Sequence, residues 1–146
     1  MTRRLLGVMA MFALMSSAHA DPPPKADGAL SPLARSIIKK RMERHGKDLL
    51  ALTHAVLLLD REKAKRLATQ VAEEPRLSRP IAGGADDLNA ALPERFFVLQ
   101  DELRLKAKAV AEAASKADDV TLAARTGELM QTCVTCHSSY LERPAQ

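Results

Sequence analysis

Apolar residues recur at helical spacing along almost the whole chain after residue 30. The first such stretch places its inward positions three and four residues apart, at Ile38, Met42, His45, Leu49, Leu52, Val56 and Leu59. A stripe with this spacing lies on one face of an α-helix and needs a facing helix to cover it. Ser31 and Pro32 mark its start as an N-cap and a first-turn proline, and Asp60 marks its end and caps the next helix.

Three further helices are predicted. The second covers residues 61–73 and ends before Pro75. Residues 74–86 are expected to form a loop because they are rich in proline and glycine. The third begins near Leu88 or at Pro93, and the fourth begins at Asp118 or Asp119 and ends at Pro144. The inward positions of the second helix are Ala64, Leu67, Ala68 and Val71. Those of the third are Leu92, Phe96, Leu99, Leu103, Ala107, Val110 and Ala114. Those of the fourth are Leu122, Thr126, Leu129, Cys133, Cys136 and Tyr140.

No run alternates between apolar and polar residues as a strand would. Four amphipathic helices with short connections predict an all-α fold, an antiparallel four-helix bundle. In this arrangement the fourth helix ends beside the beginning of the first. We therefore expect residues 133–137 to lie near the level of Met42 and His45.

The first twenty residues have the pattern of a secretory signal peptide. Arg3 and Arg4 precede an uncharged apolar run, and residues 18–20 (Ala-His-Ala) form a small-x-small cleavage site. This run is too short to span a membrane, and no later run reaches the ~18 apolar residues that a span requires. We expect a periplasmic protein cleaved after Ala20, with no membrane span, a flexible leader over residues 21–30 and one folded domain over residues 31–143.

Composition excludes several functions. The chain has 146 residues, which suits one domain. Its net charge of +4 includes Arg3 and Arg4 of the signal peptide, so only +2 remains after cleavage and a nucleic-acid-binding surface is not expected. We find no paired carboxylates with a base and no activated nucleophile, so we do not expect an enzyme.

One short motif carries specific chemistry. Cys133-Val-Thr-Cys136-His137 is the attachment signature of a c-type haem. On a helix its two cysteines and its histidine share one face. The cysteines can form two thioethers to one haem c, and His137 can bind the iron as an axial ligand.

Three other kinds of site could use this pair of cysteines. A thioredoxin-type pair needs a βαβ context, which is absent, and a structural zinc site needs four ligands without a second cysteine pair to supply them. A disulfide between Cys133 and Cys136 closes too short a loop to stabilise the fold much. A helical interaction module without haem, held by that disulfide, stays as an alternative.

With these residues in place, the chain resembles the class II cytochromes c, the cytochrome c-prime group and its low-spin relatives. The resemblance covers about residues 31–142 and rests on the haem motif, with Ser138, Ser139 and Tyr140 after it, near the C-terminus of a four-helix chain. It implies a haem at one end of the bundle, with the first helix supplying the group on the distal side of the iron.

The resemblance also suggests candidates for that distal group. In the low-spin relatives a Met followed four residues later by a Gly supplies the sixth ligand, and Met42 and Gly46 are similar to that pair. We therefore favour Met42 as the iron ligand opposite His137. The family usually has an Arg one turn earlier that reaches a haem propionate. Arg41 stands one turn before His45, so His45 is the alternative ligand, and an open five-coordinate iron is the third possibility.

Arg41 and Arg35 are candidates for pairing with a propionate, since a guanidinium matches a carboxylate, although either side chain can simply face solvent. The leading functional expectation is electron transfer outside the cytoplasm with redox partner proteins. The alternative is a protein that binds a gas such as NO or CO at an open distal site. The resemblance further implies a homodimer through the first helix, where Leu50, Leu57 and Leu58 face outward unless a loop covers them.

Overall fold

The computed structural model describes residues 32–79, 92–116 and 118–140. Within these ranges the chain forms four α-helices: α1 (Pro32–Leu57), α2 (Arg61–Glu73), α4 (Glu94–Ser115) and α5 (Asp119–Tyr140). The predicted signal peptide, the leader, the second half of the loop after α2 and the end at Pro144 lie outside the described residues. No helix in the described part is both long and apolar enough to cross a membrane.

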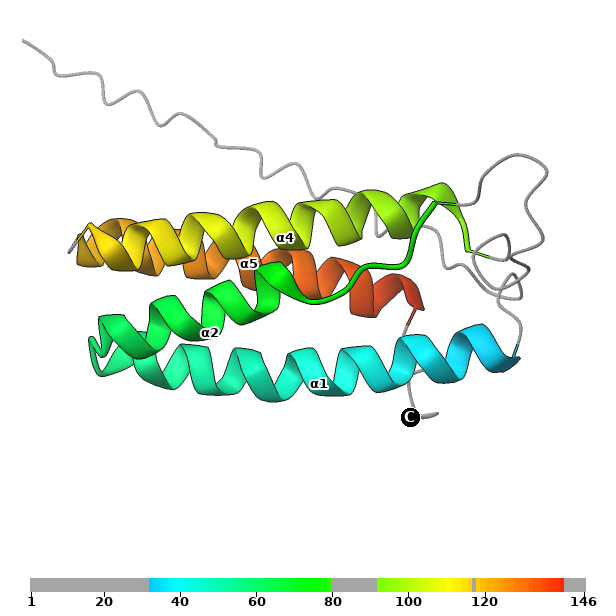
Figure 1. Cartoon of the computed structure of the whole chain (residues 1–146), viewed down its shortest axis with the longest axis horizontal. Coiled ribbons are helices and arrows are strands. Elements are labelled where there is room, and N and C mark those ends of the chain that lie inside the picture. Colours follow the sequence, from blue (N-terminus) through cyan, green and yellow to red (C-terminus); the bar gives the residue numbers. More distant parts are fainter. Residues whose placement is uncertain (1–31, 80–91, 117, 141–146) are drawn as a thin grey trace, which may run out of the picture.

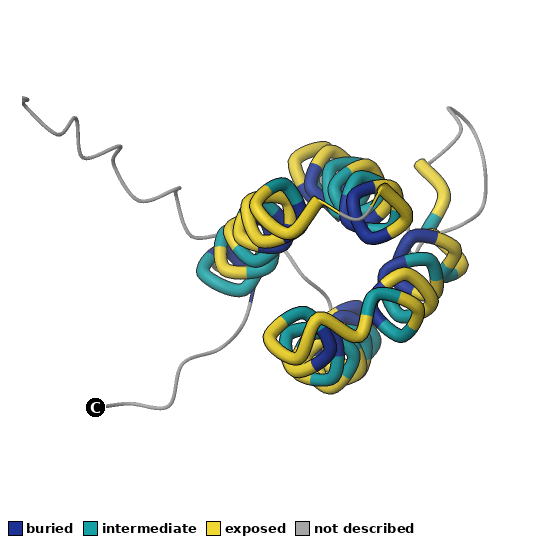
Figure 2. Tube along the Cα trace, turned by 90° about the vertical axis from the view of Figure 1, so that its left-hand side faces the viewer, coloured by how far each residue is buried: buried dark blue, intermediate teal, exposed yellow. Residues whose placement is uncertain are grey.

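The helices form an antiparallel bundle in which each packs on the next in sequence and α5 returns to α1 (Figure 1). Seen along their axes, the four helices surround a common centre, and their buried residues face inward (Figure 2). The prediction of an all-α four-helix bundle is confirmed. The end of α5 lies beside the first half of α1, as expected from the antiparallel order.

Local signals explain the helix boundaries. Asp60 caps α2, since its side chain accepts a hydrogen bond from the Lys63 backbone N–H at 3.1 Å. Pro93 immediately precedes α4. Asp118 caps α5 by accepting from the Thr121 N–H at 3.0 Å. Each position is one of those that the sequence predicts.

The end of α1 differs from the prediction. The Asp60 N–H bonds to the Ala55 carbonyl at 2.9 Å and the Leu59 N–H to the Val56 carbonyl at 3.0 Å, the hydrogen-bond pattern of a Schellman motif. Leu59 adopts a left-handed backbone with φ of 55° and is 52% exposed. The prediction that Leu59 belongs to the inward stripe is therefore wrong, because the helix stops before reaching it.

The buried side chains form two clusters along the bundle axis. The larger holds the end of α1 against the other three helices around Leu52, Leu122, Leu129 and Val110, with many alanines that let the helices approach closely. The smaller lies toward the start of α1 and contains Met42, and Cys136 packs against it; its buried members are Ala34, Ile38, Met42, Leu92, Phe96, Phe97, Leu99 and Tyr140. This second cluster brings the two ends of the described chain together.

Candidate functional site

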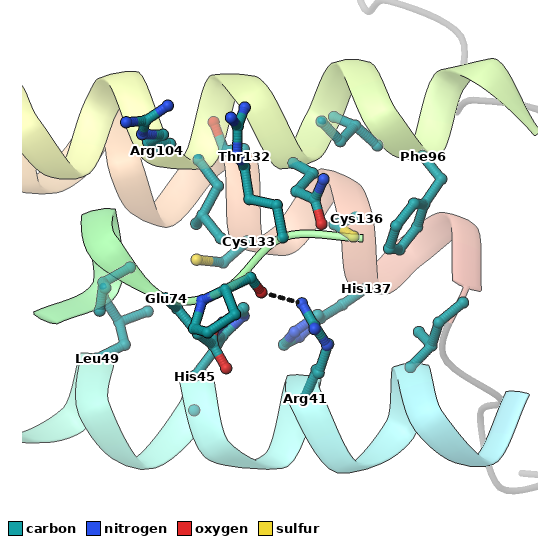
Figure 3. A pocket seen from close by; sticks show the side chains of 18 residues that line it. Arg41, His45, Leu49, Glu74, Phe96, Arg104, Thr132, Cys133, Cys136 and His137 are labelled. Carbon is teal, nitrogen blue, oxygen red and sulfur yellow. Dashed lines mark hydrogen bonds and ion pairs between the residues drawn. The ribbon is translucent and has the colours of Figure 1, made fainter. Parts of the chain in front are cut away.

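A cavity opens among the four helices near the smaller cluster (Figure 3). The free space within it is about 80 Å³, below the about 300–1,000 Å³ of typical small-molecule and cofactor sites, so a bound cofactor requires its walls to move apart. Every described helix contributes to its wall, as does the segment that follows α2. Apolar side chains make up most of the lining that the helices supply, including Ile38, Leu49, Val71, Phe96, Leu99 and Leu103.

The predicted haem motif forms the α5 wall of this cavity. Cys133, Cys136 and His137 all line it, as does the buried Thr132 one residue earlier. The hydroxyls of Thr135 and Ser139 turn back to the helix, where they donate to the carbonyls of Gln131 and Thr135 at 2.9 and 3.0 Å. The motif thus stays helical and presents its sulfur and nitrogen atoms on one face.

Both cysteines are free thiols in partly buried positions. Burial raises the pKa of Cys133, and it raises the pKa of Cys136 to about 12, with Cys133 adding a smaller contribution. Because a thiolate is the nucleophile in thiol–disulfide exchange, these pKa values disfavour a reactive redox dithiol at neutral pH. The sulfurs therefore lie in the wall as protonated, apolar-facing groups.

His137 is half-buried in the same wall. Burial lowers its pKa below the usual value, and the nearby His45 lowers it further. Both effects favour the neutral imidazole, which has a lone pair available for a metal. His137 on α5 and His45 on α1 thus face one cavity from two helices (Figure 3).

The α1 wall holds some of the predicted residues and leaves others out. Arg41, His45 and Gly46 line the cavity. Met42 does not; its side chain is 6% exposed and packs in the smaller cluster. Arg35 is exposed and lies outside the lining. A Cβ added at Gly46 would meet no atom within 4 Å, so the wall has room there.

A segment after α2, residues 74–79, which we call the strap, crosses between α1 and α4. On the α1 side Arg41 donates to the Pro75 carbonyl at 2.8 Å, and Glu74 bonds to both Arg44 and His45. The strap contributes Glu74, Pro75 and Arg76 to the cavity wall. The sequence predicts a loop here but does not reveal this role.

On the α4 side the strap is held by Gln100 and Asp101. Gln100 bonds to both backbone groups of Leu77, at 2.9 and 3.0 Å, and Asp101 pairs with Arg76 at 2.8 Å and Arg79 at 2.9 Å. These guanidinium groups hold the pKa of Asp101 below its usual value, with Arg79 acting most strongly. The result is a fixed bridge beside the cavity.

Arg104 on α4 is a further cavity residue that the sequence pattern did not predict. It lines the cavity with Arg41 and Arg76, and within the described ranges it forms no ion pair. The available signal was an arginine next to the inward Leu103. The three arginines give the apolar cavity a basic part, which suits an apolar ligand that carries carboxylates.

Within the described ranges, no group of three or more His, Cys, Asp or Glu side chains is arranged to hold a metal ion by itself. Comparisons of this chain with protein-family models, with curated proteins and with solved structures find no match.

Proposed function

We propose that this chain is a c-type cytochrome that carries one covalently bound haem c and transfers electrons outside the cytoplasm. One observation carries the proposal: both cysteines and the histidine of the Cys-x-x-Cys-His motif line the same cavity, among apolar side chains and arginines. The attachment motif thus lies where the surrounding residues suit the group that such a motif attaches.

The thiols suit covalent attachment. Each thiol adds its S–H across one vinyl group, so that sulfur bonds to one vinyl carbon and hydrogen to the other. The reaction needs no oxidant and releases no leaving group. Cys133 and Cys136 lie three residues apart on α5, so both sulfurs can reach one edge of a single porphyrin. His137, one residue further on, supplies the axial nitrogen.

The residues that line the cavity match the chemistry of the two parts of a haem. Ile38, Leu49, Leu99 and other apolar side chains match the macrocycle. Arg41, Arg76 and Arg104 match its two propionates, since guanidinium groups pair with carboxylates. The open position at Gly46 adds space on the α1 side. The donor set and the chemistry of the lining therefore favour the same ligand.

Electron transfer is the function that this cofactor supports best here. Bound haem supplies an iron atom that takes up or loses one electron. The α1 wall presents His45 toward that site, so the chain offers a donor on both sides of the cavity. Exposed Lys39, Lys40 and Lys47 on α1 give a basic surface for a weak electrostatic contact with an acidic redox partner.

The proposal includes export through the predicted signal peptide. The test is to produce the full chain in a bacterium that attaches c-type haem and to isolate it from the periplasm. We expect an N-terminus at Asp21 and a haem stain that survives a denaturing gel. A mature chain that stains for haem supports the proposal. A chain without haem and with a Cys133–Cys136 disulfide would favour the non-haem interaction module.

A double cysteine variant sharpens this test. Cys133→Ser combined with Cys136→Ser removes both thioethers, so the haem stain should disappear. Val134→Ala is the matched control, because Val134 lies between the two cysteines on the exposed side of α5. Its stain should equal that of the wild type. Loss of stain in both variants would indicate a general folding defect and contradict the assigned role of the thiols.

A second measurement separates electron transfer from gas binding. The electron-transfer protein should give a reversible one-electron wave in protein-film voltammetry, and its ferrous form should bind CO poorly. A ferrous form that binds CO readily would favour the gas-binding alternative, because an open iron site is what that function requires.

A further inference from the structure

His45 and Glu74 form a partly buried pair in the cavity wall to which His137 also belongs. The two residues lie on different elements, α1 and the strap, and both line the cavity. Their side chains are 18% and 14% exposed, and a hydrogen bond joins His45 Nε2 to Glu74 Oε2. Arg44 donates to the other oxygen of the same carboxylate at 2.8 Å. Both carboxylate oxygens are therefore engaged, and the histidine ring is held in place.

This pairing determines which nitrogen of His45 is available. When Nε2 carries the proton that is donated to Glu74, the neutral ring keeps a lone pair on Nδ1. Histidines that bind metals usually donate their other N–H to a carboxylate or a carbonyl, which fixes the ring and raises its basicity as a ligand. His45 thus has the hydrogen bonding of a metal ligand.

Met42 lies in different surroundings. It is three residues before His45 on α1, and its thioether is buried in the smaller cluster with Ile38, Phe96 and Tyr140. It is absent from the cavity lining, whereas His45 is part of it. The structure therefore brings His45 and His137 to the same space and leaves Met42 packed as a core residue.

We propose that His45 is the second axial ligand of the haem iron, opposite His137, and that Glu74 is its positioning residue. This inference rests on the proposed haem and specifies its coordination. Glu74 acts through His45: its carboxylate orients the imidazole and increases its electron donation. Because a more basic ligand favours the ferric state, the Glu74 carboxylate lowers the reduction potential of the haem.

The main test compares optical spectra of purified holoproteins with the same amount of attached haem. The wild type should be low-spin in both oxidation states. His45→Ala should become high-spin and bind CO, and added imidazole should restore the low-spin spectrum by filling the position that the side chain left. Met42→Leu should stay low-spin. His54→Ala is the matched control on the exposed side of α1 and should also leave the spectrum unchanged.

The positioning role of Glu74 is tested by measuring the reduction potential of the haem. Substituting a residue with only a structural role would not shift this potential in a predictable direction. Glu74→Gln keeps the size of the side chain and removes its charge, so the midpoint potential should become more positive while the haem stays low-spin. Glu73→Gln, its exposed neighbour on α2, removes the same charge away from His45 and should shift the potential less. Equal shifts in the two variants would refute the positioning role.

If a variant fails to fold, the second iron ligand can still be identified from the spectra of the wild type. The near-infrared charge-transfer band and the electron paramagnetic resonance spectrum of the ferric protein distinguish bis-histidine from histidine–methionine ligation. A histidine–methionine spectrum, a high-spin wild type, or a low-spin His45→Ala protein would each overturn the assignment of His45. In all three cases the covalent haem would still stain on a denaturing gel, so the assignment of a c-type cytochrome would survive, although a high-spin wild type would favour gas binding over electron transfer. Absence of the stain would refute both proposals.

Discussion

The strap depends on a single side chain of α4 for both backbone groups of its central residue. Gln100 Oε1 accepts from the Leu77 N–H at 2.9 Å, and Gln100 Nε2 donates to the Leu77 carbonyl at 3.0 Å. Gln100→Ala removes both hydrogen bonds. Each such bond contributes about 0.5–1.5 kcal/mol net, so the docking of the strap should weaken by about 1–3 kcal/mol. The exposed ion pairs of Asp101 remain, but pairs of that kind contribute only about 0–1 kcal/mol each.

Amide hydrogen exchange at Leu77 measures this effect directly. A loss of 1–3 kcal/mol corresponds to a rise of about 5-fold to about 150-fold in the rate of exchange through local opening. Lys108→Ala, at an exposed position of the same helix, is the control and should leave Leu77 exchange unchanged. The reasoning is refuted if exchange at Leu77 does not accelerate in Gln100→Ala. It also fails if the amide of buried Leu129 accelerates as much as that of Leu77, because the whole fold would then have been destabilised.

Two further predictions concern the core and the thiols. Leu52→Ala should lower the free energy of unfolding in urea by about 2–5 kcal/mol, because Leu52 is fully buried. The control is Leu50→Ala, at a residue 74% exposed, which should change this free energy by no more than about 0.5 kcal/mol. Equal losses in the two variants would contradict the packing described for α1. In protein made without haem, the raised pKa of Cys136, about 12, means that the unfolded thiol ionises first. The stability that depends on Cys136 should therefore be constant below about pH 9 and fall as the pH rises toward 12. Urea titrations across this range should show a smaller fall for Cys136→Ser, and an unchanged fall would count against the burial of that thiol.

Much of the fold follows from local patterns in the sequence. Helical spacing predicts the inward faces, and Asp60 and Asp118 mark the starts of α2 and α5, because a capping side chain bonds to a backbone group only three residues away. Leu59 shows where this reasoning stops. Its spacing continues the stripe, but a left-handed backbone ends the helix before it. The spacing of apolar residues carries no information on that backbone change.

The site could be predicted only in part, for a related reason. The motif on α5 is a local pattern, so sequence alone identifies Cys133, Cys136 and His137. The α1 and strap side of the cavity depends on contacts between residues far apart in the sequence: Glu74 reaches His45 across 29 positions, and Gln100 reaches Leu77 across 23. A heptad stripe cannot distinguish Met42 from His45, because it places both on the inner face. The contacts of the two side chains differ: Met42 packs in the smaller cluster with Phe96 and Tyr140, whereas His45 bonds to Glu74 of the strap.

The position of the two thiols near the end of the chain also orders the assembly of the site. A ribosome makes α1, α2 and α4 before it reaches residue 133, so three sides of the cavity exist as polypeptide before either sulfur does. A chain that terminates early, or that loses α5 to a protease, contains the other helices that line the cavity but lacks the sulfur atoms of Cys133 and Cys136. A haem attached covalently to these two cysteines would therefore mark only those molecules whose synthesis had included α5.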